Sequence, residues 1–249
     1  MVPRRLATDS ALPLTQSTNS AREVSDWASL KTDLAGFLGR WYGPPSHAPQ
    51  QREIPGVPAA LCGWYAAEDA WGRRLAVQNT ILKAPELVAE DGLTVFYVEN
   101  QGVWHWAFAS GTDPDVSDRE NEPRVPWSPT GATLSEFLVH AAMFEAIFAS
   151  KIGASAIDID RAHYDSVVGP LGPVPMTPWN WPGPECRLFV SDRLLAVCAV
   201  NDRPGTRVTP DSLYWLMIGA KSNDDLAYLD QLDIKWAHNT RLFGEGIYC

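Results

Sequence analysis

The sequence predicts an α+β fold in which helices cover a mainly antiparallel sheet, followed by a C-terminal β-rich extension. Three observations predict this: an amphipathic helical stripe at residues 25–41, a strand hairpin at residues 93–108, and a capped apolar helix at residues 133–150. The chain has 249 residues, a length that suits one large domain or two closely packed small ones.

Charge and composition divide the chain into three parts. Residues 1–22 carry a net charge of +2 and little periodicity, which predicts a disordered tail. Residues 23–150 form the predicted α+β domain and hold 17 acidic and 8 basic residues. Residues 151–249, the predicted extension or small lobe packed on the first, hold 12 acidic and 9 basic residues. The acidic character therefore belongs mainly to the first half.

Two helices are expected in the first third of the chain. The apolar residues of the first recur at spacings of three and four, namely Trp27, Leu30, Leu34, Leu38 and Trp41. Gly43-Pro44-Pro45 ends this helix. Pro58 suits the first turn of a second helix that covers residues 57–71.

The hairpin is the clearest β signal, because residues 93–98 and 103–108 are rich in β-branched and aromatic side chains on either side of Glu99-Asn100-Gln101-Gly102. An acidic loop and a short strand at 124–127 are expected to follow. Thr133 and Glu136 then match a capping box at the start of the next helix.

The second half is expected to be mostly strands. A helix is predicted at 160–168, and a Pro/Trp-rich connector at 169–184 should run as extended coil across the surface. We expect a hairpin from 186–190 and 194–200, a strand at 213–218, and a short helix from Ser222 to Leu232. Residues 234–236 suit a last edge strand.

Composition excludes some classes of partner. The net charge of −10 argues against nucleic acid and against an anionic membrane surface. It favours a basic partner, or solubility alone. The four cysteines form no CxxC pair and are not a disulfide framework, and no secretory or membrane-spanning segment is visible. A cytoplasmic protein is therefore expected.

No motif for catalysis or for a cofactor is present. The five histidines show no metal-ligand spacing, and there is no GxSxG, GxxxxGK[ST] or GxGxxG motif. The acids that follow Asp113 begin like a calcium loop, but Asp118 stands where glycine is needed and Arg124 where glutamate is needed. We therefore expect no metal, no cofactor and no enzyme, although a triad of distant residues stays open as an alternative.

The eleven tryptophans leave two interpretations open. Trp104 and Trp106 share one face of a strand, which favours a place in the core. Trp127, Trp179 and Trp181 could instead form a stacking platform for sugars, proline-rich peptides or small ligands. Cys186 and Cys198 lie in expected strands and should be inert, buried thiols.

Short segments resemble a known family. Residues 54–61 with Trp64-Tyr65, the hairpin turn 98–104 and the segment 131–138 are similar to those of the SUKH superfamily, which includes bacterial immunity proteins and relatives of a yeast cell-wall synthesis regulator. The resemblance covers residues 23–150. It implies an α+β fold without a cofactor and a protein that neutralises a toxin by direct binding, and it carries no catalytic residue to this chain.

The leading functional hypothesis is an immunity-type protein that covers the active site of a partner. An acidic inhibitor suits a basic nuclease, because it competes with nucleic acid in the same field. The candidate partner-binding residues are Glu99, Trp104, Asp113, Asp115, Asp118, Glu120 and Glu122. The alternative is a carbohydrate or small-ligand binder that uses Trp127, Trp179 and Trp181.

Overall fold

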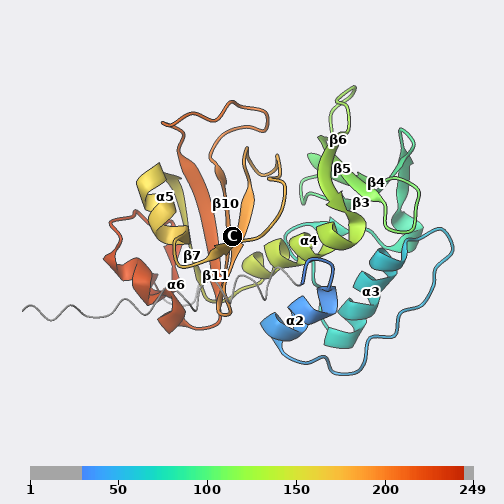
Figure 1. Ribbon diagram of the computed structural model, residues 1–249, viewed down its shortest axis with the longest axis horizontal. Helices are drawn as coiled ribbons and strands as arrows, with labels where there is room; N and C mark the ends of the chain where they lie inside the picture. The colour runs from blue at the N-terminus through green and yellow to red at the C-terminus, as the bar shows by residue number, and fades with distance from the viewer. Residues whose placement is uncertain (1–29, 244–249) are drawn as a thin grey trace, which may run out of the picture.

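The computed structural model describes residues 30–243, in which two antiparallel sheets lie on either side of one long helix (Figure 1). Sheet A runs in the order β1 (Thr80–Ile81), β3 (Leu93–Val98), β4 (Trp104–Phe108), β5 (Asp115–Glu120) and β6 (Ser128–Thr133), and β2 (Val88–Glu90) also pairs with β3. Sheet B runs in the order β12 (His238–Asn239), β7 (Gly153–Ile159), β11 (Tyr214–Ala220), β10 (Leu194–Val200), β9 (Arg187–Val190) and β8 (Gly172–Pro173). The predicted α+β class is confirmed.

The helices form layers around these sheets. Helix α4 (Leu134–Phe148) runs between sheet A and sheet B, and α2 (Leu34–Tyr42) and α3 (Ala59–Trp71) pack against α4. Helix α5 (Arg161–Val168) and the 3₁₀ helix η2 (Asn223–Gln231) pack on the other face of sheet B. The remaining short elements are the 3₁₀ helix η1 (Ala84–Glu86) and α6 (Thr240–Phe243).

The predicted capping box starts α4. The Thr133 side chain accepts a hydrogen bond from the Glu136 amide, and the Glu136 carboxylate accepts one from the Thr133 amide. Twelve of the fifteen residues in this helix are buried. A helix that is apolar on all sides needs cover on all sides, and the two sheets together with α2 and α3 supply it.

Strand β10 of sheet B consists of an unbroken run of apolar residues, and its burial explains why. All seven of its residues are buried. Leu195 and Val197 belong to the core around α4, whereas Ala196 and Cys198 belong to the core beneath α5 and η2. A strand covered on both faces has no need for a polar side, so its sequence does not alternate. The thiols of Cys186 and Cys198 are buried and unpaired, as predicted.

A buried carboxylate ties α4 to the segment before β1. Glu145 is 0% exposed and accepts hydrogen bonds from the successive amides of Val77, Gln78 and Asn79 at 2.6, 2.6 and 3.1 Å. The Tyr97 hydroxyl on β3 also donates to it. Burial raises the pKa of Glu145, and these donors oppose that rise. One side chain therefore fixes three main-chain amides that have no partner strand.

Several local predictions in the first half need correction. The predicted helix at 25–41 begins only at Leu34 in the described part of the chain, because Asp33 caps it and accepts a hydrogen bond from the Gly36 amide. Residues 25–29 and the predicted tail at 1–22 lie outside the described residues. The prediction of an acidic loop is wrong at the centre of that segment, because Asp115–Glu120 forms β5. The strand predicted at 124–127 begins instead at Ser128.

The second half also differs from its prediction. The connector at 169–184 does not run across the surface throughout, since Trp179 is 2% exposed and its backbone bridges to Cys186. The predicted edge strand at 234–236 is wrong, because the last pairing to β7 is made by β12. Strand β7 itself was not expected. Its small residues Gly153 and Ala154 give little β signal, and it is held by neighbours on both sides.

Within residues 30–243, no helix combines the length and the apolar character that crossing a membrane requires.

We predict that Glu145→Ala lowers the free energy of unfolding by about 3 kcal/mol, because it leaves the buried Asn79 amide and Tyr97 hydroxyl, and the part-buried amides of Val77 and Gln78, without their acceptor. Urea unfolding followed by tryptophan fluorescence measures this change. Glu120→Ala removes an exposed carboxylate and should alter stability by no more than about 0.5 kcal/mol. Equal losses in the two variants would contradict the role given to Glu145.

Candidate functional site

The structure separates the seven predicted partner-binding residues into two groups. Asp113, Asp115, Glu120 and Glu122 are exposed. Glu99, Trp104 and Asp118 are buried, with exposed fractions of 6%, 7% and 1%. The partner-binding prediction is therefore wrong for the second group, because a side chain covered by its own protein cannot contact a partner.

Two of the acids hold the fold together locally. Glu99 accepts hydrogen bonds from the amides of Gln101 and Val103, and this orders the turn between β3 and β4. Asp113 accepts from the amide and the hydroxyl of Ser135 at the start of α4. These bonds lower the pKa of Asp113, although partial burial raises it. A carboxylate near a helix N-terminus is favourable for the helix.

Asp118 is a buried carboxyl group on the face of sheet A that points toward α4. Its Oδ1 atom and the indole nitrogen of Trp104 have no hydrogen-bond partner among the described residues. Burial raises the pKa of Asp118 to about 6, against the opposing influence of Trp104 and Asn180. Its charge therefore affects the stability of this core and is not presented to solvent.

The three tryptophans of the alternative hypothesis do not form one platform. Trp179 is buried and stacks on Phe137 with ring centroids 5.3 Å apart. Trp181 is half-buried and packs edge-on against Trp106 at 5.5 Å. Trp127 lies with Arg119 on the other face of sheet A. The prediction that these three tryptophans form one stacking platform is therefore wrong. Trp127 alone lies beside an open pocket.

The most complete polar site lies on this outer face of sheet A and is centred on Arg119. The guanidinium donates to Asp91 Oδ2 at 2.8 Å, to Glu90 Oε1, and to the carbonyl of Val125 at 3.2 Å. The Trp127 ring lies 4.3 Å from the guanidinium carbon, a cation–π contact. These contacts fold the loop 121–127 over the strands.

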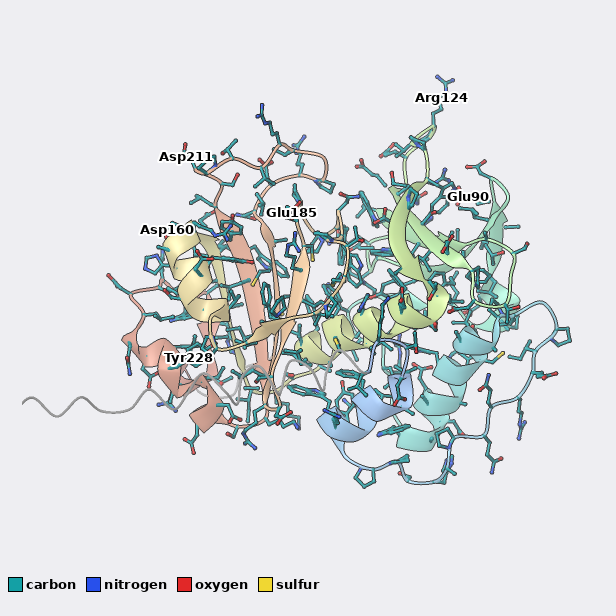
Figure 2. The ribbon with its side chains drawn as sticks, viewed as in Figure 1. Glu90, Arg124, Asp160, Glu185, Asp211 and Tyr228 are labelled. Atoms are coloured by element: carbon teal, nitrogen blue, oxygen red, sulfur yellow. The ribbon has the colours of Figure 1, made fainter. Side chains whose placement is uncertain are left out.

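A pocket of about 710 Å³ opens beside this cluster, and we call it the Arg119 pocket. It is lined by Glu90, Asp91, Arg119 and the loop residues 121–127. The loop is fixed at its start, because Asn121 bonds to the carbonyls of Val103 and Gly102. Arg124 projects at the tip of the loop, on the same arm of the molecule as Glu90 (Figure 2).

The floor of the Arg119 pocket is buried and its rim is open. The Arg119 side chain is only 8% exposed, whereas the side chains of Glu90 and Asp91 are 33% and 65% exposed. His105 lies opposite Arg119 in the strand pairing, with its Nδ1 atom 3.8 Å from Glu90 Oε2. Burial lowers the pKa of His105, which Glu90 opposes and Arg119 reinforces. The imidazole is therefore neutral at pH 7.

This arrangement suits binding better than bond chemistry. The Arg119 guanidinium, the central charge, is held by two carboxylates and covered by Trp127, so it serves to order the rim. The rim presents carboxylates, the Arg124 guanidinium and two prolines beside Trp127. Among residues 30–243, no three His, Cys, Asp or Glu side chains gather in a way that would hold a metal ion.

The sequence pointed to the rim but not to the centre of this site. Glu122 and Trp127 were both predicted, for different functions, and the structure brings them together. Arg119, Glu90 and Asp91 were missed, because their contacts join residues 28 and 29 positions apart. The one local signal is an arginine within an otherwise acidic run.

No family model, no curated protein and no solved structure matches this chain. The SUKH resemblance therefore stays a prediction.

We predict that Asp118→Asn makes the protein more stable at pH 7 than at pH 4, relative to the unchanged chain. The folded state keeps the Asp118 proton up to about pH 6, whereas the ordinary pKa of an aspartate carboxyl group is 3.8. The stabilising effect of that proton is complete below pH 4 and is lost as the pH rises through about 6. The difference should reach about 3 kcal/mol at pH 7.

Urea unfolding of both proteins between about pH 4 and pH 7 measures this difference directly. A difference that does not change with pH would show that the carboxyl group ionises as freely in the folded protein as in the unfolded chain.

Proposed function

We propose that this chain is a protein-binding module that acts by covering a basic surface of its partner with the outer face of sheet A. The observation that carries this proposal is the Arg119 pocket, where a buried arginine and Trp127 hold a proline-containing loop in one conformation beside the carboxylates of Glu90 and Asp91. A preformed rim loses little conformational entropy on binding.

The charges on this face favour a cationic partner. Three carboxylates line the pocket with two guanidinium groups, namely Glu90, Asp91 and Glu122 with Arg119 and Arg124. Arg119 is internally compensated, so the excess that reaches solvent is negative. Such a patch steers a basic partner and sets the register of docking.

Apolar contact area lies beside the acidic rim. Val103 is 49% exposed, and its carbonyl accepts the Asn121 amide, which places it next to the loop. Val88 on β2 is 52% exposed and shares the outer face with Glu90, two residues along the strand. A specific interface needs about 800 Å² on each partner, with a desolvated centre and a polar rim. This face offers both kinds of surface.

The SUKH resemblance makes the proposal more specific. The chain would then be an immunity-type protein that neutralises a toxin, such as a basic nuclease, by direct occlusion, without itself making or breaking bonds. The carbohydrate-binding alternative is not proposed, because Trp179 is buried and Trp181 and Trp127 lie on different faces of sheet A.

Charge reversal on the rim tests the proposal. Glu122→Lys changes the charge of the rim by +2, and among the described residues its carboxylate makes no hydrogen bond that would be lost. We expect affinity for a basic toxin domain encoded beside the gene to fall by at least about tenfold at low salt. We also expect the affinity of the unchanged protein to fall steeply between about 50 and about 500 mM salt. Isothermal titration measures both.

The matched control carries the same charge change on the opposite part of the molecule. Asp211→Lys alters an exposed loop residue of the C-terminal half that lies far from Glu90 and Arg124 in Figure 2. This variant should bind within about threefold of the unchanged protein. Equal weakening in both variants, or binding that does not respond to salt, would rule out the acidic face as the docking surface.

A further inference from the structure

A second pocket, with a mostly apolar lining, lies among α2, α3 and α4. Its volume is about 520 Å³, and we call it the helix pocket. Three of its lining residues are buried and form its floor, namely Ala66 and Ala67 of α3 and Leu138 of α4, with exposed fractions of 8%, 3% and 1%. Leu34 of α2 also lines it. A concave site of this size with an apolar floor is typical of small-ligand binding.

Small side chains on α3 keep the helix pocket open. The α3 residues that line it are all alanine or glycine, namely Ala59, Ala60, Gly63, Ala66 and Ala67. A Cβ atom added to Gly63 would meet no side chain, and no backbone beyond its own helix, within 4 Å. The apolar part of a ligand can therefore approach the α3 backbone closely at this point.

The mouth of the helix pocket carries two exposed carboxylates. Asp33 caps α2 and Asp113 binds the first turn of α4, and both line the pocket. No lysine, arginine or histidine belongs to the described residues that line it. Lys31 lies two positions before Asp33, but it is paired with Glu136. A helix N-terminus carries about half a positive charge, which offsets only part of a full carboxylate charge. The mouth is therefore net negative.

One carboxylate oxygen at the mouth is available to a ligand. Asp33 Oδ1 accepts a hydrogen bond from the Gly36 amide at 2.8 Å, whereas Asp33 Oδ2 accepts none from any described residue. An N–H donor that carries a positive charge forms the strongest hydrogen bonds with a carboxylate. The mouth therefore favours a cationic head group, and the floor favours an apolar body.

We propose that the helix pocket binds a small amphiphilic amine, whose apolar chain lies against α3 and whose ammonium group is held at the mouth by Asp33 and Asp113. Octylammonium is the probe for this class. Octanol and octanoate are the matched probes, because they have the same chain with a neutral and a negative head group. The inference does not depend on protein binding by the outer face of sheet A, since the helix pocket and the Arg119 pocket share no residue.

Two-dimensional NMR of the full chain tests the proposal, in about 150 mM salt so that the overall charge of the protein is screened. Octylammonium should shift the backbone amides of Gly63 and Ala67 in a saturable way, with a Kd below about 1 mM. Octanol should bind more weakly than octylammonium, and octanoate should bind at least about fivefold more weakly, because its charge is repelled at the mouth.

A substitution at Gly63 tests the apolar part of the site. Gly63→Leu places a side chain in the helix pocket, so octylammonium should bind at least about tenfold more weakly. Gly39→Leu is the matched control, because Gly39 is also a helical glycine with open space around its Cβ position but does not line the pocket. This control should leave the affinity unchanged.

A second pair of variants tests the charge. Asp33→Asn with Asp113→Asn keeps a side-chain oxygen at each helix N-terminus and removes both charges, so the preference for octylammonium over octanoate should fall below about twofold. Asp160→Asn with Asp211→Asn makes the same charge change at two exposed residues of the C-terminal half (Figure 2) and should leave the preference unchanged.

Four results would overturn the inference. They are a titration without saturable shifts at Gly63 and Ala67, equal affinity of the unchanged protein for octylammonium and octanoate, full affinity for octylammonium in Gly63→Leu, and a head-group preference that survives Asp33→Asn with Asp113→Asn.

Discussion

The structure depends on the burial of α4 between two sheets. A fifteen-residue helix with twelve buried residues could not exist in water with only one covered face. Sheet A covers it through Trp106 and Phe108, and sheet B covers it through Leu195 and Val197. The same helix therefore completes the core that joins the two sheets, whereas the second core, beneath α5 and η2, consists of residues from the C-terminal half.

Close contacts on both sides show how tightly the helix is held. On one side, the Glu145 carboxylate collects the amides of residues 77–79. On the other, Gly219 of β11 comes so near that a Cβ atom would lie 2.4 Å from the Ser150 hydroxyl oxygen and 3.3 Å from the Ile147 Cα. The outer face of sheet A is therefore carried by a rigid support.

The candidate site uses this support. The Arg119 pocket lies on the face of sheet A turned away from α4, where a loop is ordered by one arginine. An exposed rim of this kind suits a large partner.

The sequence predicted the elements whose signals are local. The hairpin of β3 and β4 follows from its β-branched and aromatic residues, and α4 follows from the Thr133 and Glu136 cap. Strand β5 was missed because Asp115–Glu120 holds one apolar residue, Val116. Burial of Asp118 and Arg119 there depends on other parts of the chain, including Glu90. The centre of the acidic site could not be predicted for the same reason.

Native-state hydrogen exchange tests the central claim most directly, by comparing the slowest amides of β4 in sheet A with those of β10 in sheet B. If α4 makes the two sheets one cooperative unit, their opening free energies should agree within about 1 kcal/mol. If the amides of β10 open several kcal/mol more easily while those of β4 and α4 stay protected, the two halves fold separately and the shared helix is not the basis of the structure.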